Sequence, residues 1–276
     1  MVLSILISTI DSGIEKIKDV LLLYRPDVKY IVSHQFTDEK FKIIPVELKR
    51  DDVIVSQIPG KGVTKSRNHA ISLAAGDICL ITDDDVRYTN EFLNTIIQTF
   101  QERNPDVALF KIKTNEGEGA YKNYPAEERR LNLKNLHSPS TIEIAFKTEK
   151  IKGSIFFDER FGLGSFLNGG AEKFFVRDAI EKGLNVCYFP EYVVNHPEES
   201  TIKSLPKYHK RRVMVWGGSD ARINGWLAIP KSFLGTIKFI PDLIKNRKNP
   251  FVYFYQRIKA SIYILTTKPG KVVAKK

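Results

Sequence analysis

The sequence predicts an α/β fold, with a mainly parallel sheet flanked by helices and a basic helical extension at its carboxyl end. Two observations carry this prediction for the 276-residue chain. Up to residue 195, short apolar runs alternate with amphipathic segments, a pattern typical of parallel strands joined by right-handed crossovers. Beyond residue 202 the strand-like runs stop, and helical patterns rich in Lys and Arg follow. We therefore expect an α/β domain over 1–202 and a basic helical region over 203–276.

Residues 1–113 contain the clearest alternation of strand and helix patterns. The predicted strands are short β-compatible runs bounded by turn residues: 2–9, 30–33, 52–58, 78–82 and 107–112. The predicted helices each present one apolar face: 14–24, 63–75 and 90–103. We expect Thr89 or Asn90 to cap the third helix, and Gly76 to close the second from the C′ position.

Residues 114–202 are less regular. Glycines, prolines and many charges fill 115–140, so this segment is either a loop near a binding site or a solvated insertion. Further strands are predicted at the following runs: 142–146, 154–158, 185–189 and 192–195. A glycine-rich stretch then leads to Glu172, where a helix opens that Gly183 closes.

Three adjacent carboxylates, Asp83, Asp84 and Asp85, directly follow the predicted buried strand 78–82. They repel one another, and Arg87 is the only cation close to them in sequence. Clustered oxygen ligands suit Mg²⁺ or Mn²⁺, and open α/β sheets bind ligands at the carboxyl ends of their strands. We therefore predict a metal site here, with a solvated acidic turn as the alternative.

Arg67 lies in the middle of an apolar helix face. The apolar members of that face are Val63, Ala70, Ile71 and Ala74. An arginine in such a stripe either snorkels to solvent or pairs with an anion. The pairing hypothesis offers two partners, a ligand phosphate or one of the three carboxylates after the next strand.

Three motifs now carry a family resemblance: Lys65-Ser66-Arg67-Asn68 in the helix, Ala74-Ala75-Gly76-Asp77 after it, and Asp83-Asp84-Asp85 after the strand. Together they resemble the donor-binding half of family-2 glycosyltransferases, over about residues 3–200. The resemblance implies a GT-A fold, a nucleoside-diphosphate sugar donor and Mn²⁺ or Mg²⁺ held by a DXD motif. It also implies a nucleotide-sugar-binding half at 1–113 and an acceptor and catalytic half at 114–202.

The resemblance further assigns roles to individual residues. It implies metal ligation by Asp83 and Asp85, with His196 in the place of the family's occasional third ligand. It implies donor contacts from five residues: Thr9, Asp11, Arg67, Asp83 and Asp84. Family members carry Gly-Glu-Asp where this chain has Gly170-Ala171-Glu172, so Glu172 stands in the position of the general base. A favourable contact with the helix dipole is the alternative role for that carboxylate.

Two departures from the family pattern concern specificity. The family's second strand usually ends in an acidic pair that helps hold the nucleoside, and here it ends in Ser33-His34-Gln35. Asp11 is the nearest substitute after the first strand. The Gln-x-x-Arg-Trp motif of processive synthases is missing, because the run Arg211 to Trp216 does not match it. We therefore expect one sugar to be added per encounter.

The resemblance implies a metal-dependent inverting glycosyltransferase of the hexosyltransferase type. It would move a sugar to a hydroxyl of a glycan or lipid-linked acceptor in bacterial surface polysaccharide or glycolipid synthesis. A sugar-phosphate nucleotidyltransferase is one alternative, although Ser8 to Gly13 makes a poor phosphate loop. A non-catalytic nucleic-acid-binding protein is another, supported by the charge of the carboxyl-terminal region alone. We expect no nucleic-acid partner.

The net charge of +11 is unevenly distributed. Residues 203–276 contain 17 Lys and Arg and 2 Asp and Glu, a net of +15, so the remainder of the chain carries 11 − 15 = −4. Basic charge beside aromatic residues in 251–265, where Arg257 and Lys259 are interspersed, is typical of a helix at an anionic membrane surface. Packing on the catalytic domain or on a second subunit is the alternative.

Several features bear on the compartment. No apolar run reaches transmembrane length, and 2–10 lacks a basic n-region and a cleavage site. Cys79 and Cys187 lie in strand-like runs and are expected to be buried, reduced thiols. These features predict a cytoplasmic protein, peripheral on the inner face of the plasma membrane, whose oligomeric state the sequence leaves open.

Overall fold

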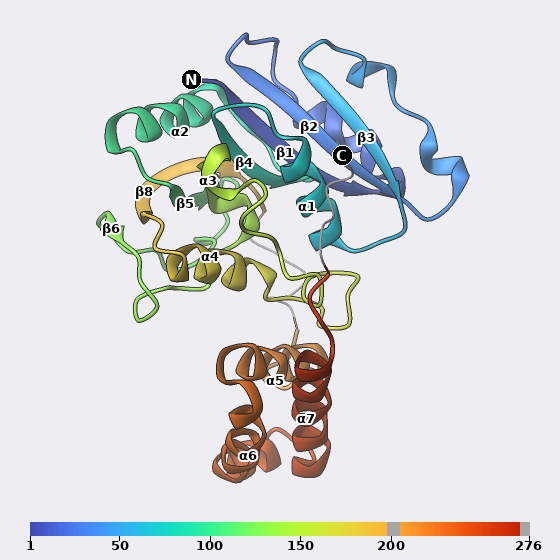
Figure 1. The fold of residues 1–276 in the computed structure, drawn as a ribbon, viewed down its shortest axis with the longest axis vertical. Helices are drawn as coiled ribbons and strands as arrows, with labels where there is room; N and C mark the ends of the chain where they lie inside the picture. Colours follow the sequence, from blue (N-terminus) through green and yellow to red (C-terminus); the bar gives the residue numbers. More distant parts are fainter. Residues whose placement is uncertain (198–204, 271–276) are drawn as a thin grey trace. The chain divides into compact units, whose positions relative to one another are not determined.

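The computed structural model describes residues 1–197 and 205–270, which divide into two compact units (Figure 1). Of the described residues, the first unit contains 1–157 and 172–197, and the second contains 158–171 and 205–270. The glycine-rich stretch before Glu172 thus belongs to the same unit as the carboxyl-terminal helices, whereas the sequence-predicted domain boundary lies at residue 202.

An eight-stranded sheet forms the centre of the first unit. Its strands lie in the order β3 (Val53–Pro59), β2 (Val28–Phe36), β1 (Leu3–Ile10), β4 (Ile78–Asp83), β7 (Ile144–Lys147), β5 (Val107–Lys113), β8 (Val186–Asn195) and β6 (Arg129–Arg130). The first four strands in this order are mutually parallel, β7 runs antiparallel to both neighbours, β8 is parallel to β5, and β6 is antiparallel to β8. The predicted α/β class with a mainly parallel core is confirmed.

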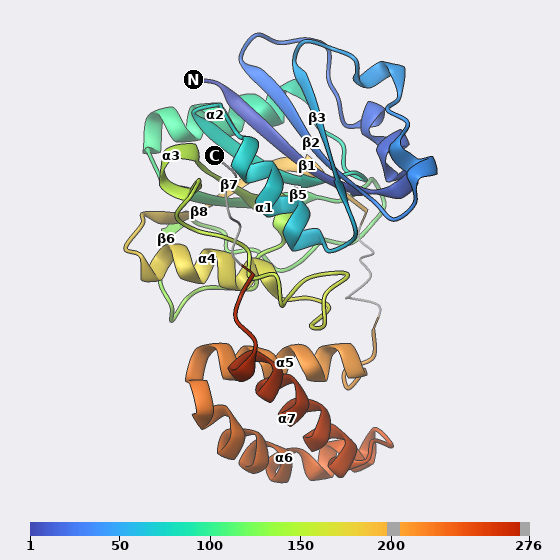
Figure 2. The ribbon, with the colours of Figure 1, turned by 45° about the vertical axis from the view of Figure 1, so that its right-hand side comes forward.

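Helices flank this sheet: η1 (Asp11–Asp19), η2 (Glu39–Lys42), η3 (Val46–Leu48), α1 (Val63–Leu73), α2 (Asn90–Arg103), η4 (Thr141–Glu143), α3 (Thr148–Ile151) and α4 (Ala171–Glu181). Figure 2 shows α1 crossing in front of β1 and β2, the strands it packs against. The Thr89 hydroxyl caps α2 by accepting a hydrogen bond of 3.3 Å from Phe92 N–H, as predicted. Aliphatic residues of β1, β2, β4 and β5 form the core with those of η1 and α2.

The predicted helix over 14–24 is wrong beyond its first turns. Ile14 and Ile17 are buried as expected, but they lie in η1, which ends at Asp19, and Tyr24 is exposed. A tight turn replaces the helix, because the Arg25 guanidinium binds both carboxylate oxygens of Asp27 directly before β2.

Gly76 does not close α1 as predicted, because the helix ends three residues earlier. Its N–H donates to Ser4 Oγ at 3.0 Å, and a Cβ atom there would lie 2.7 Å from both Ser4 Oγ and the Val2 carbonyl oxygen. Glycine is therefore required for close approach to β1, and a left-handed cap plays no part.

The strand predicted over 154–158 is absent, because a side chain takes the place of a strand partner. The Asn68 amide accepts from Phe157 N–H at 2.8 Å and donates to the Phe157 carbonyl at 2.9 Å. The two strands predicted at 185–189 and 192–195 are one strand, β8, with shifts in its register against β5. The irregular 115–140 segment contains only the two-residue β6.

The second unit contains three main helices, α5 (Lys210–Asn224), α6 (Ala228–Lys245) and α7 (Pro250–Thr266), with η5 (Gly225–Leu227) between the first two (Figure 2). α6 continues through Pro241. Glycine allows α5 to meet α7 closely, since a Cβ on Gly217 would lie 2.4 Å from the Arg257 carbonyl oxygen. Arg257 is itself buried and paired with Asp220.

The glycine-rich stretch is attached to these helices by an ion-pair cluster. Asp158 is buried and accepts from Arg160 at 2.6 and 2.8 Å, and Arg222 Nε lies 3.4 Å from the same carboxylate. Arg160 also donates to the Ile264 carbonyl near the end of α7 at 2.9 Å. The segment before Glu172 is therefore held by helices that lie much later in the chain.

Two further findings concern the compartment prediction. No helix among the described residues combines the length and hydropathy needed to cross a bilayer. Cys79 and Cys187 are free thiols, and burial raises the pKa of Cys79 to about 12. Cys79 is buried as predicted, whereas Cys187 is only partly buried.

Candidate functional site

The three consecutive carboxylates at the end of β4 have different environments. Asp83 is the last residue of β4, and its side chain is 37% exposed, while that of Asp85 is 56% exposed. Asp84 instead accepts a hydrogen bond from the Thr9 hydroxyl, and burial raises the pKa of its carboxyl. Asp83 and Asp85 are therefore the members of the triplet that are available to a ligand, and Asp84 ties β4 to β1.

Gly13 makes this tie possible. A Cβ atom there would lie 2.3 Å from Asp84 Oδ2 and 2.4 Å from Thr9 Oγ1. The backbone after β1 thus closes over the Thr9–Asp84 pair, and both predicted donor-binding residues are engaged with each other in this structure.

Arg67 links the acidic strand end to α4. Its side chain is 5% exposed, and it donates to Asp83 Oδ1 at 3.0 Å and to Glu172 Oε1 at 2.9 Å. Burial opposes the guanidinium charge, but the two carboxylates outweigh it and raise the pKa of Arg67. The snorkelling interpretation is wrong, and the predicted pairing with the carboxylate triplet is found.

Arg87, the cation nearest to the triplet in sequence, pairs elsewhere. Its guanidinium lies 3.2 Å from Asp19, and its backbone forms an antiparallel bridge with Asn195. The compensating charge at the triplet comes instead from Arg67, which is distant in sequence but lies on the helix that packs beside β1.

That bridge brings the end of β8 to the triplet. His196 follows Asn195, and its Nε2 lies 3.7 Å from Asp85 Oδ1. The His196 backbone N–H donates to the Lys113 carbonyl at 2.9 Å, and its ring meets the Tyr121 ring edge-on at 5.6 Å. The two residues predicted as metal ligands on separate segments are thus neighbours.

Glu172 lies in the first turn of α4 and is held by two donors. Besides Arg67, the Thr141 hydroxyl donates to its Oε1 at 2.7 Å. The side chain is 21% exposed, so the carboxylate is accessible to a small polar group. Sequence reasoning missed Thr141. Ser140 to Glu143 matches a helix-capping signature and could have indicated the turn, but nothing in the sequence indicates the contact with Glu172.

Asp11 is engaged at the end of β2. Its carboxylate accepts from Thr37 N–H at 2.7 Å and from the Thr37 hydroxyl at 2.9 Å, while its carbonyl accepts from His34 Nε2 at 2.9 Å. His34 Nδ1 in turn faces the Gln57 amide at 3.1 Å, and burial lowers the pKa of His34. A neutral hydrogen-bonded histidine therefore stands near the position of the family's acidic pair.

The donor set fits a hard divalent cation only in part. Within residues 1–197 and 205–270, no three His, Cys, Asp or Glu side chains converge as a ready ligand group. Mg²⁺ commonly uses one or two carboxylates, several waters and the substrate's phosphates. Asp83 and Asp85 meet that lower requirement, because both are partly exposed oxygen donors at the end of one strand.

Behind Thr141 lies a buried ion pair. Glu143 is fully buried; it contacts Lys122 Nζ, and Tyr124 OH donates to its Oε1 at 3.0 Å. Lys122→Met should lower the free energy of unfolding by about 3 kcal/mol, because it leaves a buried charge without its counter-ion. Denaturant unfolding at neutral pH measures this loss.

Lys150→Met is the matched control for that measurement, since the exposed Lys150 ammonium lies 3.8 Å from the exposed Glu149 carboxylate on the surface. It should cost less than about 0.5 kcal/mol. The loss in Lys122→Met should shrink at acidic pH, because burial raises the pKa of Glu143 and a protonated carboxyl needs no counter-ion. Equal losses of unfolding free energy in Lys122→Met and Lys150→Met would contradict the conclusion that Lys122 is the counter-ion of the buried Glu143.

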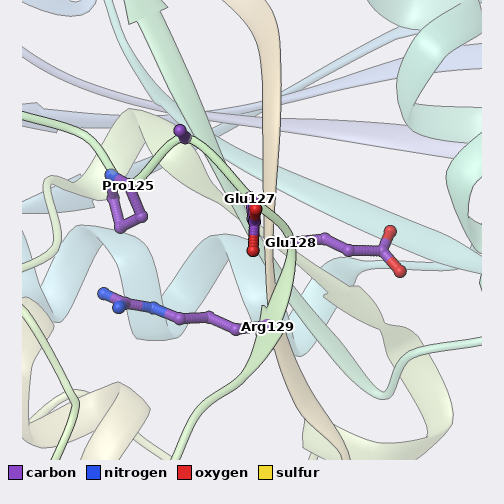
Figure 3. A pocket seen from close by; sticks show the side chains of 5 residues that line it. Pro125, Glu127, Glu128 and Arg129 are labelled. Carbon is purple, nitrogen blue, oxygen red and sulfur yellow. The ribbon is translucent and has the colours of Figure 1, made fainter.

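A pocket of about 250 Å³ lies on the 115–140 segment, lined by Pro125, Ala126, Glu127, Glu128 and Arg129. Figure 3 shows the Arg129 and Glu128 side chains pointing in opposite directions from the strand edge. None of the predicted site residues lines this pocket. The segment's role beside an acceptor stays a prediction, although its Lys122 stabilises the turn that contains Thr141.

The first unit contains most of a region that matches a known protein family. The family model described as glycosyl transferase family 2 matches residues 14–167, more than half of the chain. The chain belongs to glycosyl transferase family 2. The matched range includes Arg67 and the carboxylate triplet, and it ends before Glu172. No curated protein matches the sequence.

Solved structures similar to this family-2 chain include three of S. aureus TarS. TarS 1-349 superposes with a TM-score of 0.58 and 19% identity, over 82% of this chain and 66% of that one. Its complex with UDP-GlcNAc gives 0.56 and 19%, over 80% and 67%. The longer TarS structure gives 0.56 and 16%, over 96% of this chain and 55% of that one. At these identities the likeness shows the fold, which is GT-A-like as predicted.

Proposed function

We propose that this family-2 member is a metal-dependent, inverting glycosyltransferase. It moves one sugar from a nucleoside-diphosphate sugar to a hydroxyl of a glycan or lipid-linked acceptor, in bacterial surface polysaccharide or glycolipid synthesis. The observation that carries the proposal is the Arg67 bridge. It joins Asp83, at the end of β4, to Glu172, at the start of α4, through bonds of 3.0 and 2.9 Å. Asp83, the carboxylate proposed to hold the metal, and Glu172, the carboxylate proposed as the base, therefore bind the same guanidinium.

Each residue then has a chemical role. Asp83 and Asp85, with His196 beside them, would hold Mn²⁺ or Mg²⁺, which when bound neutralises charge on the leaving nucleoside diphosphate. Arg67 adds a fixed positive charge at the same strand end. Glu172 accepts the proton of the acceptor hydroxyl as that oxygen attacks the anomeric carbon from the face opposite the leaving group. A single displacement of this kind inverts the anomeric centre.

We expect the nucleotide-sugar donor to bind at the same end of the sheet. Thr9, Asp11 and Asp84 lie at the carboxyl ends of β1 and β4, where open α/β sheets bind ligands. UDP-GlcNAc, the ligand in a TarS complex, is the first donor to test. The family membership favours transfer of an activated sugar over its synthesis by a nucleotidyltransferase, and over nucleic-acid binding.

Thermal unfolding with a panel of nucleoside diphosphates tests this proposal. A matching nucleotide at a hundredfold excess over its Kd adds about 2.7 kcal/mol to the free energy of unfolding. We expect that stabilisation with Mn²⁺ or Mg²⁺ and not with EDTA. Stabilisation by no nucleotide would contradict the transferase function, and equal stabilisation in EDTA would contradict metal dependence.

We also propose that the second unit binds an anionic membrane surface, which would place the protein peripherally on the inner face of the plasma membrane. Large apolar side chains are exposed on it: Trp226, Leu227, Phe233, Leu234, Ile237, Ile244, Phe251, Val252 and Tyr255. Basic residues surround them in sequence, and 203–276 carries a net of +15. A second copy would bring the same charge and be repelled, so anionic lipid is the better partner.

Phe251 and Tyr255 are the proposed inserting residues, being 83% and 62% exposed. Phe254 on the same helix packs against Phe233 with ring centroids 6.0 Å apart, and Arg257 is buried rather than surface-exposed. Replacing both Phe251 and Tyr255 with Ala should weaken sedimentation with phosphatidylserine vesicles about tenfold, through lost apolar burial. The remaining attraction should fall with salt.

Leu23→Ala with Ile43→Ala is the matched control, because these side chains are comparably exposed but lie on the first unit. It should leave vesicle binding unchanged. Binding to neutral and anionic vesicles alike would contradict the electrostatic part of the proposal. Salt-sensitive nucleic-acid binding would point to the alternative partner.

A further inference from the structure

The bonds to Glu172 are concentrated on one of its oxygens. Arg67 Nη1 donates to Oε1 at 2.9 Å, and Thr141 Oγ1 donates to the same atom at 2.7 Å. Among the residues that the structure describes, none donates a hydrogen bond to Oε2. Two donors on Oε1 fix the plane of the carboxylate and leave Oε2 as the oxygen that can receive a proton.

Thr141 is placed rigidly enough to orient this carboxylate. It is 5% exposed and opens η4, directly before the central strand β7. Ser140 N–H donates to Glu143 Oε2 at 3.3 Å, and the buried Glu143 is paired with Lys122. Lys122 Nζ also donates to the Ser138 carbonyl at 3.0 Å. The turn that carries the Thr141 hydroxyl is therefore held from both sides.

Arg67 alone would hold Glu172 less well during the reaction. Its guanidinium is divided between Asp83 and Glu172, so a donor diphosphate that attracts Arg67 weakens its bond to the carboxylate. Thr141 is a neutral donor, so the charge of a diphosphate attracts it less strongly than it attracts the Arg67 guanidinium. It also adds no charge that would oppose proton acceptance by the carboxylate.

We propose that Thr141 is a positioning residue that holds Glu172 Oε1, so that Oε2 faces the acceptor hydroxyl and takes its proton. This inference rests on the transferase function proposed above. Position counts strongly in such a step, since a misplacement of about 1 Å can cost about a hundredfold in rate. The hydroxyl of Thr141, and not its methyl group, is the feature that matters.

Thr141→Val and Thr141→Ser separate these two features in the full-length chain. With the donor that the nucleotide panel identifies, Thr141→Val should lower kcat at least about tenfold while the donor KM stays within about twofold. Thr141→Ser keeps the hydroxyl and should restore kcat to near the wild-type value.

Thr99→Val is the packing control, because the buried Thr99 hydroxyl donates to the Thr95 carbonyl within α2. It should leave kcat unchanged. Equal kcat in Thr141→Val and wild type, or equal losses in Thr141→Val and Thr141→Ser, would overturn the proposal.

A double-mutant cycle keeps the contact testable without any turnover. Thr141→Val, Glu172→Ala and their combination are compared by thermal unfolding. Residues in direct contact should lower the melting temperature by less together than the sum of their separate effects. An additive cycle in a chain that is active overturns the positioning role alone. A wild-type chain that transfers no sugar overturns the proposed function, and this role with it.

Discussion

Glu172→Gln is expected to leave nucleoside-diphosphate binding intact and to lower sugar transfer by roughly 10²–10⁴-fold, the usual contribution of a general base. The substituted amide has the same shape, and its oxygen can still accept from Arg67 and Thr141. It cannot take the proton of the acceptor hydroxyl, so binding and catalysis separate. Calorimetric titration with the nucleotide and a transfer assay on the same preparation measure both effects.

Glu181→Gln is the matched control for this variant, because Glu181 lies at the other end of α4 and pairs with Arg177 on the surface. It should transfer sugar at the wild-type rate. Transfer near the normal rate in Glu172→Gln would reduce Glu172 to a favourable charge at a helix end. Asp158 could not then take its place without rearrangement, because its carboxylate is bound by Arg160 and approached by Arg222.

Asp85→Asn is expected to weaken Mn²⁺-dependent binding of a nucleoside diphosphate by at least about a hundredfold, because loss of an outer-shell partner alone usually costs about 10–100-fold and Asp85 is proposed as a direct ligand. Asp85 is the most exposed carboxylate of the triplet, and its Oδ1 lies 3.7 Å from His196 Nε2. Its substitution should therefore leave the fold and the Arg67 bridge intact. Titration calorimetry with Mn²⁺ and with EDTA separates the metal-dependent part of the affinity.

Asp51→Asn provides the control, since Asp51 is an exposed aspartate in the turn before β3. Its nucleotide affinity should match the wild type with and without Mn²⁺. Unchanged Mn²⁺-dependent binding in Asp85→Asn would remove this residue from the proposed metal site. Asp84→Asn is a poor choice for this purpose, because Asp84 contacts Thr9 and its loss would disturb the join between β4 and β1.

Local patterns in the sequence were sufficient for the α/β class and most strands, and they also singled out the carboxylate triplet. Apolar periodicity and turn residues act over a few residues, so β4 and α2 could be predicted nearly to their ends. The motifs around Arg67 and Asp83 indicated the family, which the family comparison confirms. The predicted roles of individual site residues stay predictions, as does the domain boundary at residue 202.

Only the tertiary structure decided which charges meet. The sequence offers the triplet as one of several partners for Arg67, but it does not indicate the second partner, Glu172, which lies 105 residues further along the chain. The Thr141 hydroxyl donates a hydrogen bond to the same carboxylate from η4, the turn directly before β7. No local pattern in the sequence places that turn near α4. Gly76 and Asn68 show the same limit, because a close backbone approach and a side-chain bond to Phe157 replaced the predicted cap and strand. Periodicity reports which face of an element is buried, whereas the partner on that face depends on how distant segments pack.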